Sequence, residues 1–244
     1  MLGTLAQYHF DRLDGILSAA GTRVSEENLD DLRAGLIEIP GTDVGALAKI
    51  GIALNGRNDC LFVVRNLETP IGRVAISNRG SGNLFLFGNV SRSRELSITV
   101  RVDGSQTTVA FPDAGAAPLH IPNAYLRSDG QTLYWGRGAT SVASKIEIEG
   151  NNRHVIVGDD CMLSSGVWIR NHDMHTLFET TTGKVVNLVK ANVVLEQHIW
   201  LGFEAFVLAV ERIGFGSVVG ARLFEGQYTT RMSCRWHACQ GGAS

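Results

Sequence analysis

Apolar residues in the second half of the chain recur at every sixth position. The main run consists of Leu195, Leu201, Val207, Ile213 and Val219. An earlier run with the same interval consists of Val157, Leu163 and Ile169. An α-helix repeats about every 3.6 residues and a strand every two, so neither produces this spacing. A coil of three short strands does produce it, because each face directs one aliphatic side chain inward. The spacing therefore predicts a parallel β-helix built from hexapeptide repeats.

Residues 1–56 have a different pattern and are predicted to form a helical N-terminal segment. An apolar stripe over residues 5–17 has helical spacing. A second helix is predicted over residues 25–36 and a third over residues 43–50, each beginning at a residue suited to an N-cap. Because the end of a β-helix is an open strand edge, we expect these helices to pack on the coil or to cap one end of it. The alternative is a partner-binding module.

Residues 57–130 are predicted to form an irregular β region that leads into the coil, either as irregular early coils or as a small sandwich. Branched and aromatic residues gather in short runs separated by Gly, Asn and Asp. The predicted strands cover residues 60–64, 74–77, 84–87, 96–102 and 107–111. Their spacing is not six, so the hexapeptide-repeat β-helix is assigned to residues 131–224. Trp135 and Tyr134 are expected to pack in the core, although stacking on a sugar ring is an alternative.

The six-residue rhythm is interrupted between Ile169 and Leu195. These residues are 26 apart, whereas one coil of three sixes needs 18, so about eight residues are extra. A polar, turn-like segment at residues 180–183 is consistent with a loop that leaves the coil. His172 and His175 lie near its start. Loops on rigid scaffolds often carry function, so this loop is the first place to look for a site.

Composition narrows the classes of function. The 244-residue chain has a formal net charge of −2, which argues against a nucleic-acid partner. The sequence contains no run of 18 apolar residues, so no membrane span is predicted. The N-terminus lacks a basic stretch followed by an apolar core, so no secretory signal peptide is predicted. None of the four cysteines forms a CxxC motif, which favours reduced thiols and a cytoplasmic protein.

Residues 157–179 and 193–221 together resemble the hexapeptide-repeat acyltransferases, and most closely the O-acetyltransferase-like group associated with bacterial surface polysaccharides. The resemblance rests on the six-residue rhythm, on Asp-x-His before the loop and on His-x-Trp-x-Gly in the following coil. It implies a mainly β fold, a left-handed parallel β-helix with the N-terminal helical segment. It also implies a homotrimer with sites between subunits, acetyl-CoA as the acyl donor and a sugar or sugar-nucleotide acceptor.

The resemblance also assigns roles to five residues. It implies that His175 is the general base, since neutral imidazole near pH 7 can take the proton of an attacking hydroxyl. Asp173 would orient the loop or the imidazole, although a turn role is an equal alternative. Trp200, Gly202 and Phe203 match the part that faces the thioester. The backbone N–H of Phe203 is the candidate donor to the developing oxyanion.

Other polar residues near these motifs carry weaker signals. His172 stands where the family more often has a small polar residue, and His198 fits a structural pattern. Ser164 and Ser165 precede the loop and are expected to fill a corner, although hydrogen bonding to the acceptor is an alternative.

The chain departs from the family pattern after Val219. The next ladder position is Glu225, and residues 225–244 have no aliphatic spacing, which suggests a shifted reading frame or a truncated gene. Three metal-ligand residue types in this tail, Cys234, His237 and Cys239, give only a weak zinc signal.

Two rival functions follow from the same fold. A γ-type carbonic anhydrase would need a histidine pair five apart, whereas His172 and His175 are three apart. A catalytically inactive or structural β-helix protein is the main alternative, because of the atypical tail.

Overall fold

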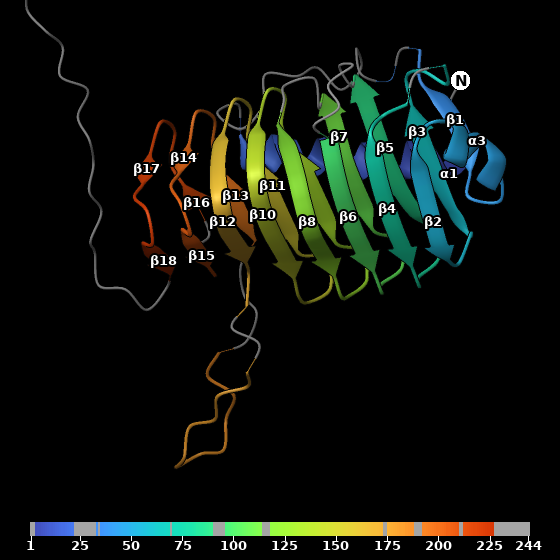
Figure 1. Ribbon diagram of the computed structural model, residues 1–244. Helices are drawn as coiled ribbons and strands as arrows, with labels where there is room; N and C mark the ends of the chain where they lie inside the picture. Colours follow the sequence, from blue (N-terminus) through green and yellow to red (C-terminus); the bar gives the residue numbers. More distant parts are fainter. Residues whose placement is uncertain are drawn as a thin grey trace, which may run out of the picture.

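The computed structural model describes residues 3–21, 33, 35–68, 70–89, 96–113, 118–172, 175–187, 192–209 and 212–226. The described chain winds into a parallel β-solenoid, with strands stacked coil upon coil around an apolar interior (Figure 1). This confirms the predicted mainly β, parallel β-helix fold; its left-handed sense stays a prediction.

Two sheets form the long faces of the solenoid within the described residues. Sheet A contains β1 (Ile37–Pro40), β3 (Cys60–Val64), β5 (Asn83–Asn89), β7 (Thr108–Asp113), β9 (Thr132–Trp135), β11 (His154–Val157), β13 (Val193–Leu195) and β16 (Arg212–Ile213). Sheet B contains β2 (Ile52–Gly56), β4 (Arg73–Asn78), β6 (Leu96–Val102), β8 (Leu119–Leu126), β10 (Thr140–Ile148), β12 (Met162–Arg170), β14 (Trp200–Leu201) and β17 (Val218–Val219), with β15 (Phe206–Leu208) and β18 (Phe224–Gly226) beside them. Only β1, which pairs with β3, runs antiparallel to its neighbour in these sheets as described.

The strand register explains the six-residue ladder. Leu195 pairs with Ile213, and Leu201 pairs with Val219, so each ladder residue lies beside the one that follows three steps later. The ladder residues thus form three inward columns, one on each face of the later coils. In the third column, Val207 on β15 pairs with Glu225 on β18. The apolar ladder residues are buried, so the predicted inward columns are confirmed.

The earlier coils lack this rhythm because each consists of two longer strands instead of three short ones. Val74 pairs with Ile98, and Leu119 pairs with Ser141, so these coils are longer than the later ones and differ from each other in length. Residues 57–130 are therefore a regular part of the same solenoid, not an irregular lead-in. The predicted strands at 60–64 and 96–102 coincide with β3 and β6.

Aromatic side chains stack inside these longer coils. The Phe62 and Phe85 rings, on neighbouring strands, have centroids 5.0 Å apart. The Phe87 and Phe111 rings repeat the arrangement at 5.7 Å, and Trp135 continues the column at 6.2 Å from Phe111. All five side chains are fully buried, which confirms the core position predicted for Trp135.

The first helix lies along the side of the solenoid and not over its end. Helix α1 (Thr4–Ala20) crosses behind the strands of sheet A (Figure 1). Its Phe10 and Leu13 pack in one cluster with Leu84 and Tyr134 from the outer face of that sheet. The apolar stripe therefore predicted the helix correctly, and its packing partner is a sheet face.

The capping role falls to the short helix α3 (Val44–Lys49). Asp43 caps it, with a carboxylate oxygen that accepts a hydrogen bond from the Ala46 N–H at 2.9 Å. Leu47 and Ile50 are fully buried and belong to the cluster that fills the coil interior. The helix predicted over residues 43–50 is thus confirmed.

Two predicted boundaries differ from the structure. Strands β1 and β2 lie within residues 1–56, the segment with helical spacing, because the solenoid begins earlier than the sequence rhythm shows. The C-terminal strand β18 adds a short piece of coil beyond the predicted end at 224. Two predictions lie outside the described residues. These are most of the helix predicted over residues 25–36 and the tail from 227 to 244 with its three candidate zinc ligands.

Two sequence predictions, on membrane spans and on the cysteines, can be compared with the described residues. No helix among them is long and apolar enough to cross a membrane. Cys60 and Cys161 are buried free thiols, and burial raises the pKa of each to about 12, which makes them unreactive.

Candidate active site

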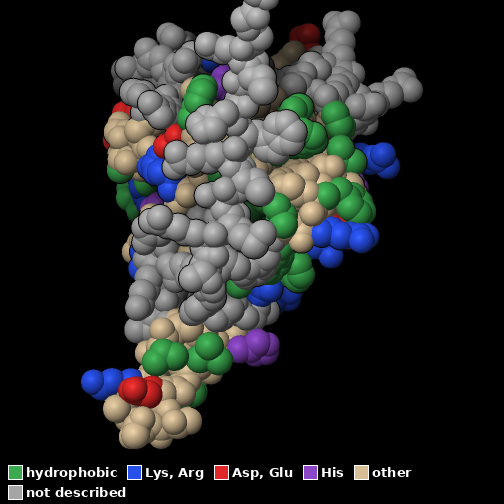
Figure 2. Space-filling model, turned by 90° about the vertical axis from the view of Figure 1, so that its left-hand side faces the viewer, with side chains coloured by type: hydrophobic (Ala, Val, Ile, Leu, Met, Phe, Trp, Pro, Cys, Tyr) green, Lys and Arg blue, Asp and Glu red, His purple; other side chains and the backbone are tan. Residues whose placement is uncertain are grey.

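His175 lies on a hairpin that projects from the coil between β12 and β13. Phe178 and Val185 form an antiparallel bridge, and the N–H of Val186 donates to the carbonyl of Leu177 at 2.9 Å. Figure 1 shows this segment standing away from the solenoid, and Figure 2 shows it from the C-terminal end. The His175 side chain is exposed, as a general base that meets an incoming substrate must be.

The loop is longer than predicted. Met162, before the loop, pairs with Trp200, whereas Trp200 pairs with Val218 on the next coil. The first of these intervals is more than twice the second, so the loop inserts more chain than a whole coil contains. The predicted excess of about eight was wrong because it compared Ile169 with Leu195, which lie on different faces of the coil.

Asn187 ties the His175 backbone to the far side of the hairpin. Its side-chain Nδ2 donates to the carbonyl oxygen of His175, and its Oδ1 accepts from the Leu177 N–H at 2.7 Å. One carboxamide therefore fixes two backbone groups on the segment that carries the candidate base. The sequence interpretation did not select Asn187; its only signal was an asparagine, which can both donate and accept, inside the predicted loop.

The start of the loop is held against the preceding coil. The Asn171 side chain accepts from the Glu149 N–H at 2.9 Å and donates to the Glu149 carbonyl at 2.9 Å. His172 is only 5 % exposed, and its Nε2 lies 4.0 Å from Oε2 of Glu147. This buried position favours a structural role for His172. Asp173, the predicted partner of His175, lies outside the described residues.

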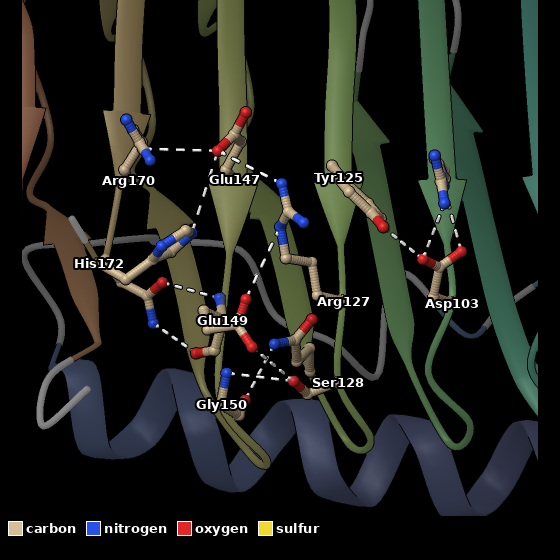
Figure 3. A network of polar contacts seen from close by, with 12 residues as sticks. Asp103, Tyr125, Arg127, Ser128, Glu147, Glu149, Gly150, Arg170 and His172 are labelled. Carbon is tan, nitrogen blue, oxygen red and sulfur yellow. Dashed lines mark hydrogen bonds and ion pairs between the residues drawn. The ribbon is translucent and has the colours of Figure 1, made fainter. Parts of the chain in front are cut away.

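The contacts of His172 belong to a polar network on the outer face of sheet B (Figure 3). Glu147 Oε2 lies 3.4 Å from Arg170 and 3.8 Å from Arg127, whose side chains come from different coils. Such charge pairs link coils laterally, so the network ties the base of the loop to the strands before it.

The same network continues through Tyr125. Its ring lies between the guanidinium groups of Arg101 and Arg127, at 4.4 and 4.0 Å from the ring centroid. The Tyr125 hydroxyl donates to Asp103, which Arg101 also contacts at 3.1 Å. Partial burial opposes ionisation of Asp103, but the hydrogen bonds from Arg101 and Tyr125 outweigh it and hold its pKa below the usual range.

Trp200 and Gly202 lie on the coil that follows the loop. The Trp200 side chain is 50 % exposed on β14, between Met162 and Val218 of the neighbouring strands. Gly202 is buried, and a Cβ atom there would lie 2.7 Å from the backbone nitrogen of Ala221. Only glycine fits this close approach of two coils.

The backbone N–H of Phe203 is unpaired among the described residues, although the N–H groups of Gly202 and Glu204 on either side are bonded. Glu204 has positive φ, and three other corners with the same turn hydrogen bond have positive φ at Gly138, Gly216 and Arg222.

At the first two of these corners the amide equivalent to that of Phe203 donates to a carboxylate oxygen, whereas at the third the Ala221 N–H has no hydrogen-bond partner among the described residues. The Arg137 N–H donates to Asp159 at 2.8 Å, and the Phe215 N–H donates to Glu196 at 2.7 Å. The geometry of the Phe203 corner therefore suits a negatively charged oxygen.

Within the described residues of one chain, no direct contact links the two parts of the predicted site. His175 precedes the Phe178–Val185 bridge of the hairpin, whereas Trp200 lies on β14 and Gly202 and Phe203 follow that strand directly. Within the described residues, His175 forms no hydrogen bond or ion pair with any of these three. Sheet A is covered by α1, so the outer surface left for a second copy is that of sheet B, β15 and β18.

The remaining candidate residues have structural surroundings. His198 has positive φ and makes an edge contact with the Phe215 ring, with centroids 5.2 Å apart. Ser165 accepts a hydrogen bond from Glu204 N–H through its carbonyl at 2.9 Å, as expected for a corner position. The described part of the chain contains no group of three or more His, Cys, Asp or Glu side chains placed to hold a metal ion.

The chain is similar in sequence to a known acetyltransferase, although no family model matches it. A polysialic acid O-acetyltransferase of Neisseria meningitidis is 29 % identical over 134 residues, which cover 53 % of this chain and 57 % of that protein. The chain thus matches little more than half the length of this curated relative.

Among solved structures, the polySia-specific acetyltransferase NeuO superposes with a TM-score of 0.50 at 18 % identity, covering 72 % of this chain and 82 % of that one. The polysialic acid O-acetyltransferase OatWY gives a TM-score of 0.39 at 18 % identity, with coverage of 70 % and 77 %. The likeness to NeuO supports the β-solenoid fold. The sequence similarity and the fold are thus consistent with the resemblance found in the sequence.

Proposed function

We propose that this protein is an O-acetyltransferase that moves an acetyl group from acetyl-CoA to a hydroxyl of a sugar polymer. The observation that carries the proposal is the unpaired Phe203 N–H, because the equivalent amides of Arg137 and Phe215 bind carboxylate oxygens in the described chain. The exposed His175 on its fixed loop supplies a base. The similarity to a polysialic acid O-acetyltransferase supports the acetyl donor and the sugar-polymer acceptor.

The chemistry needs two groups from the protein. The acceptor hydroxyl attacks the thioester carbonyl carbon while neutral His175 takes its proton. The carbonyl oxygen becomes negative, and the Phe203 N–H donates a hydrogen bond to it. When the C–S bond breaks, the protonated His175 returns the proton to the leaving thiolate. No covalent enzyme intermediate is needed. The proton taken from the acceptor hydroxyl leaves on the CoA thiol, so His175 is neutral again after each turnover.

The complete site is proposed to form between copies of the chain, in a homotrimer. His175 and Phe203 lie on separate parts of one chain, so a neighbouring copy supplies the missing half. The exposed apolar side chains of Met162 and Trp200 flank this surface and support contact with a neighbour or with the pantetheine arm of acetyl-CoA. Asp173 is retained as a proposed orienting residue for His175.

The rival proposal is an inactive or structural β-helix, motivated by the atypical tail. It predicts that no acceptor stimulates release of CoA from acetyl-CoA. The acetyltransferase proposal predicts acceptor-dependent release of free CoA thiol with a panel of sugar polymers that includes polysialic acid.

A mixing experiment tests the shared site. Copies carrying His175→Ala are combined with copies carrying Phe203→Pro, each nearly inactive alone. If each site takes His175 from one copy and Phe203 from another, mixed oligomers regain part of the native activity. Failure to regain any activity in confirmed mixed oligomers would mean that both groups act from the same chain.

A further inference from the structure

A cavity of about 660 Å³ lies between the second half of α1 and the outer face of sheet A. Its apolar lining comes from Ile16, Ala19, Ala20, Ile156 and Val194, and its polar lining from Arg12, His154, Asn192 and Arg212. The volume is in the range of sites that hold small molecules. Neither His175 nor any residue of the Trp200–Phe203 corner lines it.

Arg12 brings an uncompensated positive charge to this cavity. Its Nη1 donates to the Gln106 carbonyl at 2.7 Å, and its Nη2 is buried without a hydrogen-bond partner among the described residues. Arg12 forms no ion pair within the described part of the chain. Burial lowers its pKa, but an arginine remains charged at neutral pH.

His154 lies on the same wall and is also incompletely bonded. Its ring Nδ1 is buried without a partner in the described chain, whereas its backbone N–H donates to Asn192 at 3.0 Å. Burial, with the nearby Arg12 as a second cause, lowers the pKa of His154 to about 4. The ring is therefore neutral at pH 7 and adds no charge to the cavity.

Arg212 adds a second guanidinium from the last part of sheet A. Its Nη1 contacts Glu196 at 2.6 Å, and its Nη2 donates to the Ala20 carbonyl at the end of α1 at 2.8 Å. Glu196 neutralises Arg212, and the described lining itself contains no Asp or Glu, so the uncompensated positive charge of the cavity is that of Arg12. Burying a cation away from water is unfavourable unless an anion accompanies it.

We propose that this cavity binds a small amphiphilic anion, with a carboxylate or phosphate group facing Arg12 and His154 and an apolar part against Ile16 and Val194. This goes beyond acetyl transfer, because the cavity is on the opposite side of the coil from sheet B. Asn192, which lines the cavity, is the first described residue after the His175 loop, so the ligand would contact the point where that loop rejoins the coil.

The test uses octyl phosphate and octanoate as probes of the whole chain by calorimetric titration, with octanol as the neutral control. The native protein is expected to bind at least one anion at a single site, and Arg12→Met to bind it at least tenfold more weakly. Octanol is expected to bind much more weakly than the anions. In parallel, the His154 ring titration is followed by NMR, and bound anion is expected to raise its pKa from about 4.

A second variant keeps the proposal testable if Arg12→Met does not fold. Ala19→Trp fills the cavity without removing a charged group, and it is expected to abolish binding while leaving the thermal unfolding transition cooperative. Equal anion affinity in native, Arg12→Met and Ala19→Trp proteins would overturn the proposal. So would the absence of binding by either anion at millimolar concentration.

Discussion

Replacing Phe203 by proline removes the proposed oxyanion donor together with an exposed aromatic ring that lies 5.8 Å from the Arg222 guanidinium. The Phe203 N–H has no partner among the described residues, so its loss breaks no hydrogen bond there. The preceding residue is Gly202, which lacks the Cβ that clashes with a following proline ring. We therefore expect Phe203→Pro to fold, with a thermal transition close to that of the native protein.

The expected loss of activity is large. Removing one oxyanion donor typically lowers kcat by about 10²–10³-fold, or about 3–4 kcal/mol of transition-state stabilisation. The matched control is Phe203→Ala, which keeps the N–H and removes the 43 % exposed ring. Release of CoA thiol is measured for both variants at saturating acetyl-CoA.

The two variants separate a backbone role from a side-chain role. We expect Phe203→Ala to stay within a few-fold of native kcat and Phe203→Pro to lose about 10²-fold or more. Equal kcat values for the folded proline and alanine variants would refute the assignment of this amide.

Three further predictions concern the loop, the coil and the helix. Asn187→Ala is expected to lower kcat about tenfold with little change in the KM for acetyl-CoA, because the carboxamide holds the backbone of His175; a KM effect alone would contradict this. Gly202→Ala is expected to destabilise the fold by about 1–3 kcal/mol in a denaturant titration, since the new Cβ meets backbone at 2.7 Å; an unchanged midpoint would show that the coils can separate freely. Burial lowers the pKa of His9 to about 4 in the folded state, so the unfolded chain binds a proton between about pH 6.5 and 4 that the folded chain does not. The free energy of unfolding is therefore expected to fall as pH is lowered through this window, by about 3 kcal/mol from His9, and His9→Gln should flatten that slope.

The later coils could be predicted from sequence because their geometry repeats. Leu195, Leu201 and Val207 point inward from three successive faces, and each interval is the same. The earlier coils have two long strands, and the registers of Val74 and Leu119 show that the length of a coil varies there. No fixed period then marks them, although their strands were recognisable from β-branched and aromatic residues.

The candidate site was only partly accessible to the same reasoning. His175 and Trp200 were found through side-chain motifs. Asn187 acts on the backbone of a residue well before it in the chain, so nothing local in the sequence marks it. Nothing in the sequence distinguishes the Phe203 amide from other corner amides. The structure draws attention to it because the equivalent amides of Arg137 and Phe215 are bonded to carboxylates.

The most direct test of the account is acetylation of the acceptor itself. Polysialic acid and other sugar polymers are incubated with acetyl-CoA and the native protein, His175→Ala or His198→Ala, and new O-acetyl groups are detected by NMR. The account predicts O-acetyl groups with native protein and with His198→Ala, and none above background with His175→Ala. O-acetylation that persists undiminished in the His175→Ala protein would contradict the assignment of His175 as the base.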